Sequence, residues 1–193
     1  GFLRFMEKLG ESDGVKSASA AGQGGDAVKI MSIHASKGLQ FPVCILAAGS
    51  SRFNKSDSTD SLLVHENGGV GFKMCDEERG VRYTTAAREA IALLTDEAAL
   101  AEELRLLYVA MTRAEEKLVL LVSEDNLEKS LARLAGPLDG SGSRPVPPSA
   151  VLDAKGYADW MLTAALLHPD GEELRHMAGA DFGPAVGEGH IRI

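Results

Sequence analysis

Residues 32–42 of the chain, SIHASKGLQFP, place several polar groups directly before an apolar run. Ser32, His34 and Lys37 carry a hydroxyl, an imidazole and an ammonium group, which can together hold a polar ligand through hydrogen bonds. The segment is therefore either a ligand site at the mouth of a buried strand or an ordinary turn between two strands. The residue types alone leave both interpretations open.

Arg113 is the second candidate, within the segment EELRLLYVAMTRAEEKLVLL at residues 102–121. It stands at the end of a predicted helix and just before an apolar run, KLVLLV, at residues 117–122. A cation in the last turn suits the helix dipole, and the stem of an arginine can be buried while its head reaches solvent. On position alone, this structural role is the favoured interpretation.

The helix that ends near Arg113 has apolar residues on two of its sides. At 100° per residue, one side carries an apolar stripe and the opposite side another. The first stripe is Leu104, Leu107, Tyr108 and Met111; the second is Leu106, Val109 and Ala110. We therefore expect this helix to lie buried between layers, with Tyr108 in the core.

The elements around these candidates predict an α/β domain with a small β insertion. Strands are expected at residues 28–33, 43–48 and 117–122, and continuous apolar strands of this kind are typical of parallel sheets covered by helices. Asn67-Gly68 between residues 62–65 and 70–73 predicts a hairpin. Helices are expected at residues 84–114 and 126–134, and Thr95-Asp96 could interrupt the first and cap a second helix.

Composition divides the chain into four parts. Residues 1–26 are expected to be the end of an upstream helix and a Gly/Ser/Ala linker, and residues 27–135 a compact domain. Residues 136–156 are a second linker rich in Gly, Pro and Ser. Residues 157–193 are a helical segment, whose first helix should stop near His168-Pro169. The chain is expected to be a piece of a longer protein.

Charge and length exclude several classes of protein. The 193 residues carry a net charge of −8, so binding of nucleic acid by bulk electrostatics is not expected. No apolar stretch reaches the roughly 20 residues of a membrane span, and no membrane partner is expected. Two cysteines make no disulfide framework, and a reducing cytoplasm is the expected compartment. Cys44, Cys75, His34 and His65 show no metal-ligand spacing, so no metal site is predicted.

Together the two segments resemble known helicase motifs. IMSIHASKGLQFPVCILA resembles motif V, and EELRLLYVAMTRAEEKLVLL resembles motif VI, of the superfamily 1 DNA helicases of the UvrD/Rep type. The insertion between them and the later segment GYADWMLTAALLHPDGEE are most similar to the AddA helicase–nuclease subunits, which are RecB-like. The resemblance covers about residues 27–170 and implies a RecA-like second lobe, called 2A, of a P-loop NTPase.

The resemblance also implies a role for each candidate residue. Ser32 and His34 would face the DNA backbone, and Lys37 and Gly38 would form the turn that joins the DNA side to the nucleotide side. Gln40, where relatives usually carry glutamate, would meet the ribose through an uncharged amide. Arg113 would reach the γ-phosphate as an arginine finger. The implied ligands are ATP with Mg²⁺ and single- or double-stranded DNA, and the implied partner is the second subunit of an AddAB-type complex.

Half of the expected catalytic equipment is missing from the chain. The sequence has no G-x-x-x-x-G-K-[S/T] phosphate loop and no apolar strand ending in an acidic pair for magnesium. ATP and Mg²⁺ would therefore be bound mainly by a first lobe outside the chain, and the isolated chain should be inert. The chain could instead come from a UvrD/Rep-type repair helicase without nuclease, or from a non-catalytic architectural relative.

Overall fold

In the computed structural model of the chain, residues 27–47, 51–138, 146–184 and 189–192 are described. The chain forms two units, residues 1–32 and residues 33–193. The helix predicted at residues 1–9 and the linker predicted at residues 10–26 lie outside the described residues. No described helix is long and apolar enough to cross a membrane.

The strand predicted at residues 28–33 is wrong. Residues 27–32 contain no helix or strand, and the side chains of Val28 and Ile30 are more than nine-tenths exposed. A strand needs a neighbour for its backbone N–H and C=O groups. Among the described residues, no strand pairs with residues 28–33, so the β-branched composition is not sufficient to form a strand.

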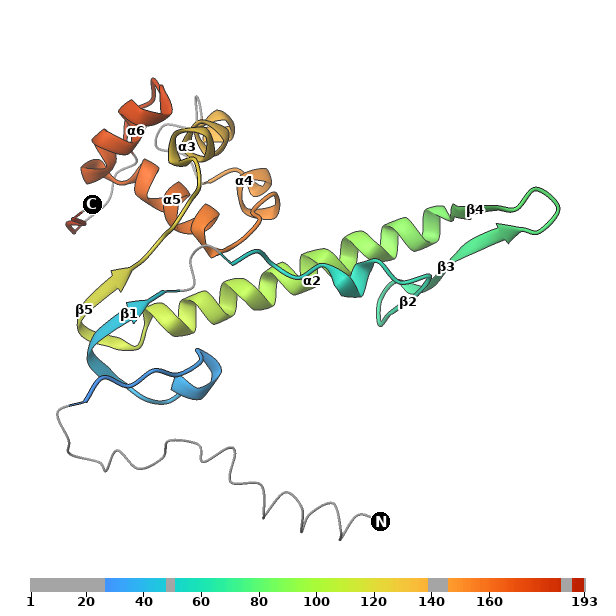
Figure 1. Cartoon of the computed structure of the whole chain (residues 1–193), viewed down its shortest axis with the longest axis horizontal. Coiled ribbons are helices and arrows are strands. Elements are labelled where there is room, and N and C mark those ends of the chain that lie inside the picture. Colours follow the sequence, from blue (N-terminus) through green and yellow to red (C-terminus); the bar gives the residue numbers. More distant parts are fainter. Residues whose placement is uncertain (1–26, 48–50, 139–145, 185–188, 193) are drawn as a thin grey trace, which may run out of the picture. The chain divides into compact units, whose positions relative to one another are not determined.

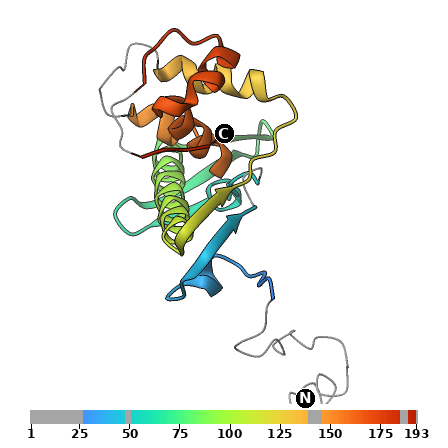
Figure 2. The ribbon, with the colours of Figure 1, turned by 90° about the vertical axis from the view of Figure 1, so that its left-hand side faces the viewer.

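Two parallel strands form the sheet that carries both candidate motifs, and they lie side by side in Figure 1 and Figure 2. β1 (Phe41–Leu46) pairs with β5 (Ala114–Leu120), and the register places Phe41 beside Ala114 and Leu46 beside Leu120. The α/β class predicted from the apolar runs is confirmed.

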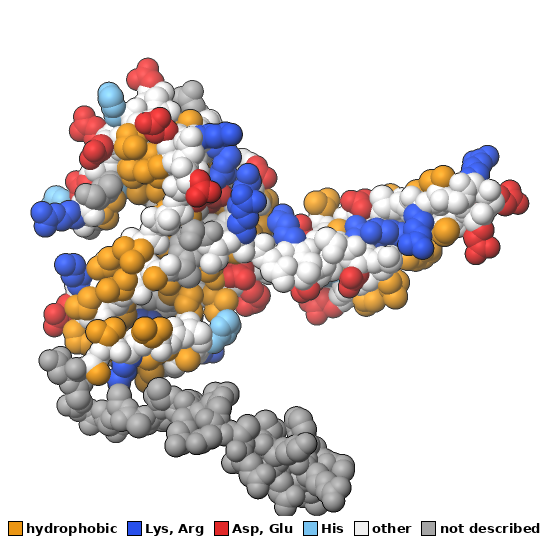
Figure 3. All heavy atoms as spheres, viewed as in Figure 1, with side chains coloured by type: hydrophobic (Ala, Val, Ile, Leu, Met, Phe, Trp, Pro, Cys, Tyr) orange, Lys and Arg blue, Asp and Glu red, His pale blue; other side chains and the backbone are white. Residues whose placement is uncertain are grey.

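The faces of β1 are less covered than expected. Val43 and Ile45 are 51% and 61% exposed, although a strand of a fully covered parallel sheet would bury both. Figure 3 shows hydrophobic side chains at the molecular surface over β1 and β5. The apolar run therefore predicts the strand correctly, but the described residues do not cover both of its faces.

One long helix, α2 (Ala86–Met111), precedes β5 in the chain and contains the first part of the second motif segment, residues 102–121. The hydroxyl of Thr85 caps its start by accepting a hydrogen bond from the N–H of Arg88 at 3.2 Å. The predicted interruption at Thr95-Asp96 is wrong, because the hydroxyl of Thr95 donates to the carbonyl of Ile91 at 2.9 Å inside a continuous helix. A threonine can thus satisfy its side chain within the helix instead of ending it.

The predicted burial of this helix between two layers is also wrong. Leu107 and Ala110 are buried, but Leu104 and Met111 are partly exposed and Tyr108 is 69% exposed. The segment is helical, as its apolar periodicity predicts. In the described part of the chain, no element covers the face that Tyr108 occupies.

The insertion between the motifs is a three-stranded antiparallel sheet. It consists of β2 (Leu62–His65), β3 (Gly69–Asp76) and β4 (Val81–Thr84), and a short 3-10 turn, η2 (Ser56–Ser58), precedes it. The predicted hairpin is confirmed as β2 and β3, whereas β4 was not predicted. Both β2 and β3 pack on the first half of α2 (Figure 1).

Arg88 anchors this sheet to the helix. Its buried guanidinium donates to the carbonyl of Ser58 at 2.7 Å and to the carbonyl of Asp60 at 2.8 and 3.2 Å. Glu89 accepts from Arg88 at 3.0 Å and from the hydroxyl of Thr84 at 2.7 Å, and the Thr84 bond is the main cause of its lowered pKa. The segment entering β2 is therefore held by one buried cation.

Gly71 marks the closest approach between β3 and α2. A Cβ atom there would lie 2.5 Å from the Cα of Arg88. We therefore expect Gly71→Ala to lower the free energy of unfolding by about 1–3 kcal/mol, because helix and strand backbones must separate. Gly136→Ala is the matched control, since its Cβ would enter open space in a helical backbone. Equal urea midpoints for the two variants would contradict this packing.

Helices form the remainder of the second unit, in the order α3 (Leu127–Ala135), η3 (Gly136–Leu138), α4 (Pro148–Leu152), α5 (Tyr157–Leu167), η4 (Pro169–Gly171) and α6 (Glu172–Ala178). Leu131, Leu138 and Leu166 are fully buried in their core. The predicted helices at 126–134 and from 157 to about 168 are confirmed, and α6 was not predicted. Figure 2 shows α3, α5 and α6 grouped together.

A second core cluster joins the helices to α2. Leu100 and Leu107 of α2 pack with Tyr157, Trp160 and Met161 of α5. Phe53 lies against the same group, with its ring centroid 4.8 Å from that of Trp160. Burial, followed by its hydrogen bond to Glu103, raises the pKa of the Tyr157 phenol. The phenol donates this bond at the edge of the cluster.

Candidate functional site

A tight turn precedes β1 and contains three of the predicted site residues. The 3-10 turn η1 (His34–Ser36) leads into Lys37 and Gly38, and the N–H of Leu39 donates to the carbonyl of Ser36 at 3.0 Å. Lys37 has φ −58° and ψ 126°, and Gly38 has φ 83°. These angles define a type II turn, whose third position needs a positive φ and therefore favours glycine.

The start of β1 lies beside the start of β5. Because the strands are parallel, the residues that precede them meet at the same edge of the sheet. The N–H of Phe41 donates to the carbonyl of Arg113 at 2.9 Å. Gln40 and Arg113, which are 73 positions apart in the sequence, are thus brought to adjacent strand entrances.

The guanidinium of Arg113 connects the helix end to the turn. It donates to the carbonyl of Val109 at 2.9 Å, to the carbonyl of Leu39 at 2.9 Å and to the hydroxyl of Thr112 at 3.0 Å. The bond to Val109 satisfies a carbonyl in the last turn of α2, as the helix-end interpretation predicts. The bond to Leu39 is a long-range contact that the helix end alone does not require.

The charge of Arg113 is not offset by a carboxylate. Its side chain is half-buried, and its hydrogen-bond partners among the described residues are all neutral oxygens. A guanidinium presents its donors in a rigid fork that suits phosphate oxygens. This arrangement keeps a fixed cation at the edge of the sheet.

The remaining predicted residues are open to solvent. His34, Lys37 and Gln40 are exposed at the same strand entrance, and no hydrogen bond joins their side chains to another described residue. Ser32 is also exposed, but it belongs to the other unit. The structure therefore brings together His34, Lys37, Gly38, Gln40 and Arg113.

Two residues that bind the guanidinium of Arg113 were not predicted from the sequence. The hydroxyl of Thr112 precedes Arg113 directly, so its position in the sequence could have indicated it. Leu39 contributes only its backbone carbonyl, and no side-chain pattern could indicate that. In the described ranges, no cluster of three or more His, Cys, Asp or Glu residues could hold a metal ion.

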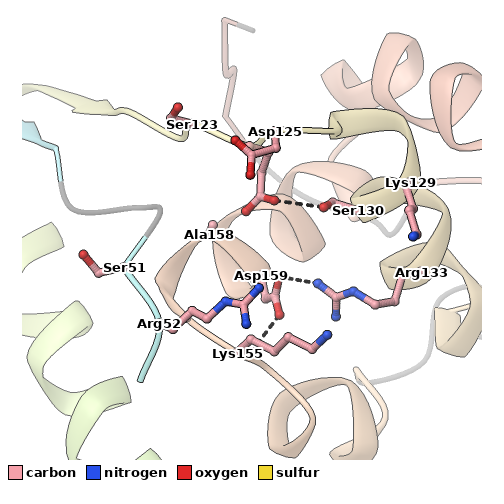
Figure 4. Close-up of a pocket in the computed structure, with 12 residues that line it drawn as sticks. Ser51, Arg52, Ser123, Asp125, Lys129, Ser130, Arg133, Lys155, Ala158 and Asp159 are labelled. Atoms are coloured by element: carbon pink, nitrogen blue, oxygen red, sulfur yellow. Dashed lines mark hydrogen bonds and ion pairs between the residues drawn. The ribbon is translucent and has the colours of Figure 1, made fainter. Parts of the chain in front are cut away.

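A polar cavity of about 610 Å³ lies at the opposite ends of the two strands (Figure 4). Its walls come from residues 51–52, from residues 123–125 and from the starts of α3 and α5. None of its charged residues was predicted as a site residue. The spacing of Lys129 and Arg133 places them on one face of α3, but no signal in the sequence links them to Arg52 or Lys155.

The sequence matches the UvrD-like helicase C-terminal domain over residues 6–125. This match covers more than half of the chain and includes both strand entrances. The chain therefore belongs to the family of UvrD-like helicase C-terminal domains.

Several curated relatives are named as subunits of an ATP-dependent helicase/nuclease. The chain is 39% identical over 182 residues to the protein of Clostridium perfringens, with 94% of the chain and 14% of that protein covered. It is 42% identical over 188 residues to the protein of Heliobacterium modesticaldum, with 96% and 13% covered. The chain thus spans about one seventh of the length of these relatives.

Proposed function

We propose that the chain is the 2A lobe and following segment of an ATP-dependent DNA helicase. The complete protein would be the AddA-type component of a helicase–nuclease that acts in double-strand-break repair and recombination. The observation that carries this proposal is the 2.9 Å hydrogen bond from Arg113 to the carbonyl of Leu39. It brings the arginine of the second motif to the turn of the first motif, which supports a single site built from both motifs.

In this proposal Arg113 acts as the arginine finger. Its uncompensated guanidinium would stabilise the negative charge that develops on the γ-phosphate during transfer. To reach a phosphate, it would exchange the neutral oxygens of Leu39 and Thr112 for charged ones, and charge-assisted hydrogen bonds are stronger. ATP supplies the phosphoryl group, and its Mg²⁺ would be held mainly by a first lobe outside this chain.

Gln40 and Gly38 are proposed to border the nucleotide. Gln40 is exposed beside the entrance of Arg113, so its amide is free to meet a ribose hydroxyl. Gly38 fixes the backbone direction at that point through its positive φ of 83°. A side chain at this position would strain the turn that brings Leu39 to Arg113.

Ser32, His34 and Lys37 are proposed to contact the DNA backbone. Their exposed hydroxyl, imidazole and ammonium groups suit phosphate oxygens and read no base sequence. Residues 27–135 would form the 2A lobe, residues 136–156 a connection, and residues 157–193 the helical approach to a nuclease domain. The proposed partners are DNA, ATP and the second subunit of an AddAB-type complex.

The isolated 193-residue chain is expected to hydrolyse no ATP. Arg113 alone cannot hold a triphosphate with its magnesium ion, and the sequence contains no phosphate loop. Phosphate release should stay at the level of a no-protein control, with or without single-stranded DNA. Magnesium-dependent turnover that persists in Arg113→Ala would contradict the proposal, because another group in the chain would then perform the chemistry.

A further inference from the structure

We propose that the polar cavity at the carboxyl ends of β1 and β5 is a second binding site for the phosphates of a nucleic-acid strand. The inference rests on the proposed DNA-binding function and adds a contact outside both motifs. Its charged residues come from four chain segments, which are the loop after β1, the segment after β5, α3 and the start of α5.

The cavity is separate from the nucleotide edge. Arg113 and Gln40 precede the two parallel strands, whereas the cavity follows them. β1 has six residues, so the two edges are about 20 Å apart at 3.3 Å per residue. The cavity therefore cannot contribute to the same phosphate contacts as Arg113.

Residues 52–53 are fixed against the two residues that precede α5. Arg52 forms an antiparallel bridge with Gly156, and the N–H of Phe53 donates to the carbonyl of Lys155 at 2.8 Å. These backbone contacts place Arg52 and Lys155 on the same wall of the cavity. In Figure 4 the guanidinium of Arg52 ends beside Asp159, and the side chain of Lys155 runs past Asp159 toward Arg133.

One carboxylate of the cavity is already engaged. Asp159 is buried, and it accepts from Arg133 at 2.6 Å and from the backbone N–H of Lys155 at 2.8 Å. A buried carboxylate is stable when it is paired and hydrogen-bonded in this way. Asp159 and Arg133 therefore form an ion pair in the cavity wall whose charges offset each other. Glu124 accepts from the hydroxyl of Ser130 at 2.9 Å.

Three cations of the cavity are not engaged. The side chains of Arg52, Lys129 and Lys155 make no hydrogen bond or ion pair with any residue that the structure describes. Asp125 is the carboxylate that is similarly unpaired, and Figure 4 places it on the side away from Arg52 and Lys155. The lining carries four cations and three carboxylates, because Glu124 is bonded only to a neutral hydroxyl, so its net charge is +1. This local positive charge contrasts with the net charge of −8 of the chain and favours an anionic ligand.

The lining also indicates which anion fits. A volume of about 610 Å³ exceeds what one phosphate needs and lies in the usual range of ligand cavities. The lining residues include no aromatic side chain on which a base could stack. Lysine, arginine and serine side chains instead favour phosphate oxygens and carry no sequence readout. A nucleic-acid strand held by its phosphate backbone fits both the volume of the cavity and its lack of aromatic side chains.

The test is a salt series of single-stranded DNA binding to the 193-residue chain. Fluorescence anisotropy of labelled oligo-dT should give a wild-type Kd in the non-specific range of about 10⁻⁴ to 10⁻⁶ M. The cavity variant is Lys129→Gln/Lys155→Gln. The control is Arg79→Gln/Arg82→Gln, two exposed arginines near the β3–β4 turn, with the same change in net charge.

The cavity variant should bind about tenfold more weakly at low salt, and its slope of log K against log salt should fall by about 2, at about 1 per lysine. The control variant should change the affinity at low salt and the salt slope far less than the cavity variant does. If the double variant melts earlier than wild type, Arg52→Gln replaces it, with an expected slope change of about 1. Equal slopes for the cavity and control variants would overturn the proposal.

Additional arms separate this proposal from the proposed function. If His34→Ala weakens DNA binding while the cavity variant binds like wild type, the cavity proposal fails and the motif assignment stands. If wild type binds no DNA at low salt, both fail. Competition by inorganic phosphate or polyglutamate at the same charge concentration as DNA would show an unselective anion site, and would also overturn the proposal.

Discussion

Replacing Arg113 with alanine in the complete helicase is expected to lower ATP turnover by about 10³- to 10⁵-fold. In the proposed role, the guanidinium of Arg113 meets the γ-phosphate only when the two lobes close on the nucleotide. Its loss should therefore destabilise the transition state more than it weakens nucleotide binding. DNA unwinding should fall with turnover, while DNA affinity changes much less. Steady-state ATPase kinetics beside DNA-binding titrations measure both effects.

Arg105→Ala is the matched control for this experiment. Arg105 lies on the same helix, α2, and its side chain is 71% exposed and paired with Glu102. Its removal should leave turnover close to wild type. Arg113→Ala deletes three hydrogen bonds to half-exposed groups, so a thermal melt should show a folded domain with a small loss of stability. Near-normal turnover in Arg113→Ala, or loss of the fold, would return Arg113 to a helix-end role.

Leu131→Ala is expected to lower the free energy of unfolding by about 2–5 kcal/mol. Leu131 of α3 is fully buried between helices, so truncation removes apolar contacts and leaves a cavity. Urea denaturation followed by circular dichroism measures the change. Leu121→Ala deletes the same atoms at a 49% exposed position and should cost far less. Equal losses for the two variants would mean that the helices do not form the core described here.

Local patterns were sufficient to predict much of the fold. Asn67-Gly68 predicts the β2–β3 hairpin as a local turn signal. In the structure the loop is residues 66–68, and the positive φ of 77° falls on Gly69. The apolar runs predict β1 and β5, and Asn126 predicts the start of α3, where its side chain accepts from the N–H of Lys129. In each case the signal and the structure lie within a few residues of each other.

The errors arise where distant residues decide the structure. Residues 28–33 have strand composition, but a strand also needs a partner, and no residue pattern indicates whether one is present. Tyr108 looks like a core residue, yet its burial depends on what packs against that face of α2. β4 was missed because its residues, VRYT, form too short an alternating run to distinguish from a loop.

The candidate site divides in the same way. Gly38 and Arg113 were identified through the resemblance of their segments to two helicase motifs, while spacing alone favoured a structural role for Arg113. The contact between Arg113 and the carbonyl of Leu39 joins residues 74 positions apart through strand pairing, so it required the structure. The cavity residues come from four segments and carry no shared pattern, which is why none was predicted.

The most direct test of the proposed role is single-turnover ATP hydrolysis by the complete helicase carrying Arg113→Lys, measured with saturating single-stranded DNA. Lysine keeps the positive charge and the helix-end interaction, but it cannot reproduce the planar fork that donates to several oxygens at once. The arginine-finger role predicts that the lysine variant hydrolyses ATP nearly as slowly as Arg113→Ala, while it binds nucleotide with almost unchanged affinity. Turnover close to wild type in Arg113→Lys would contradict it.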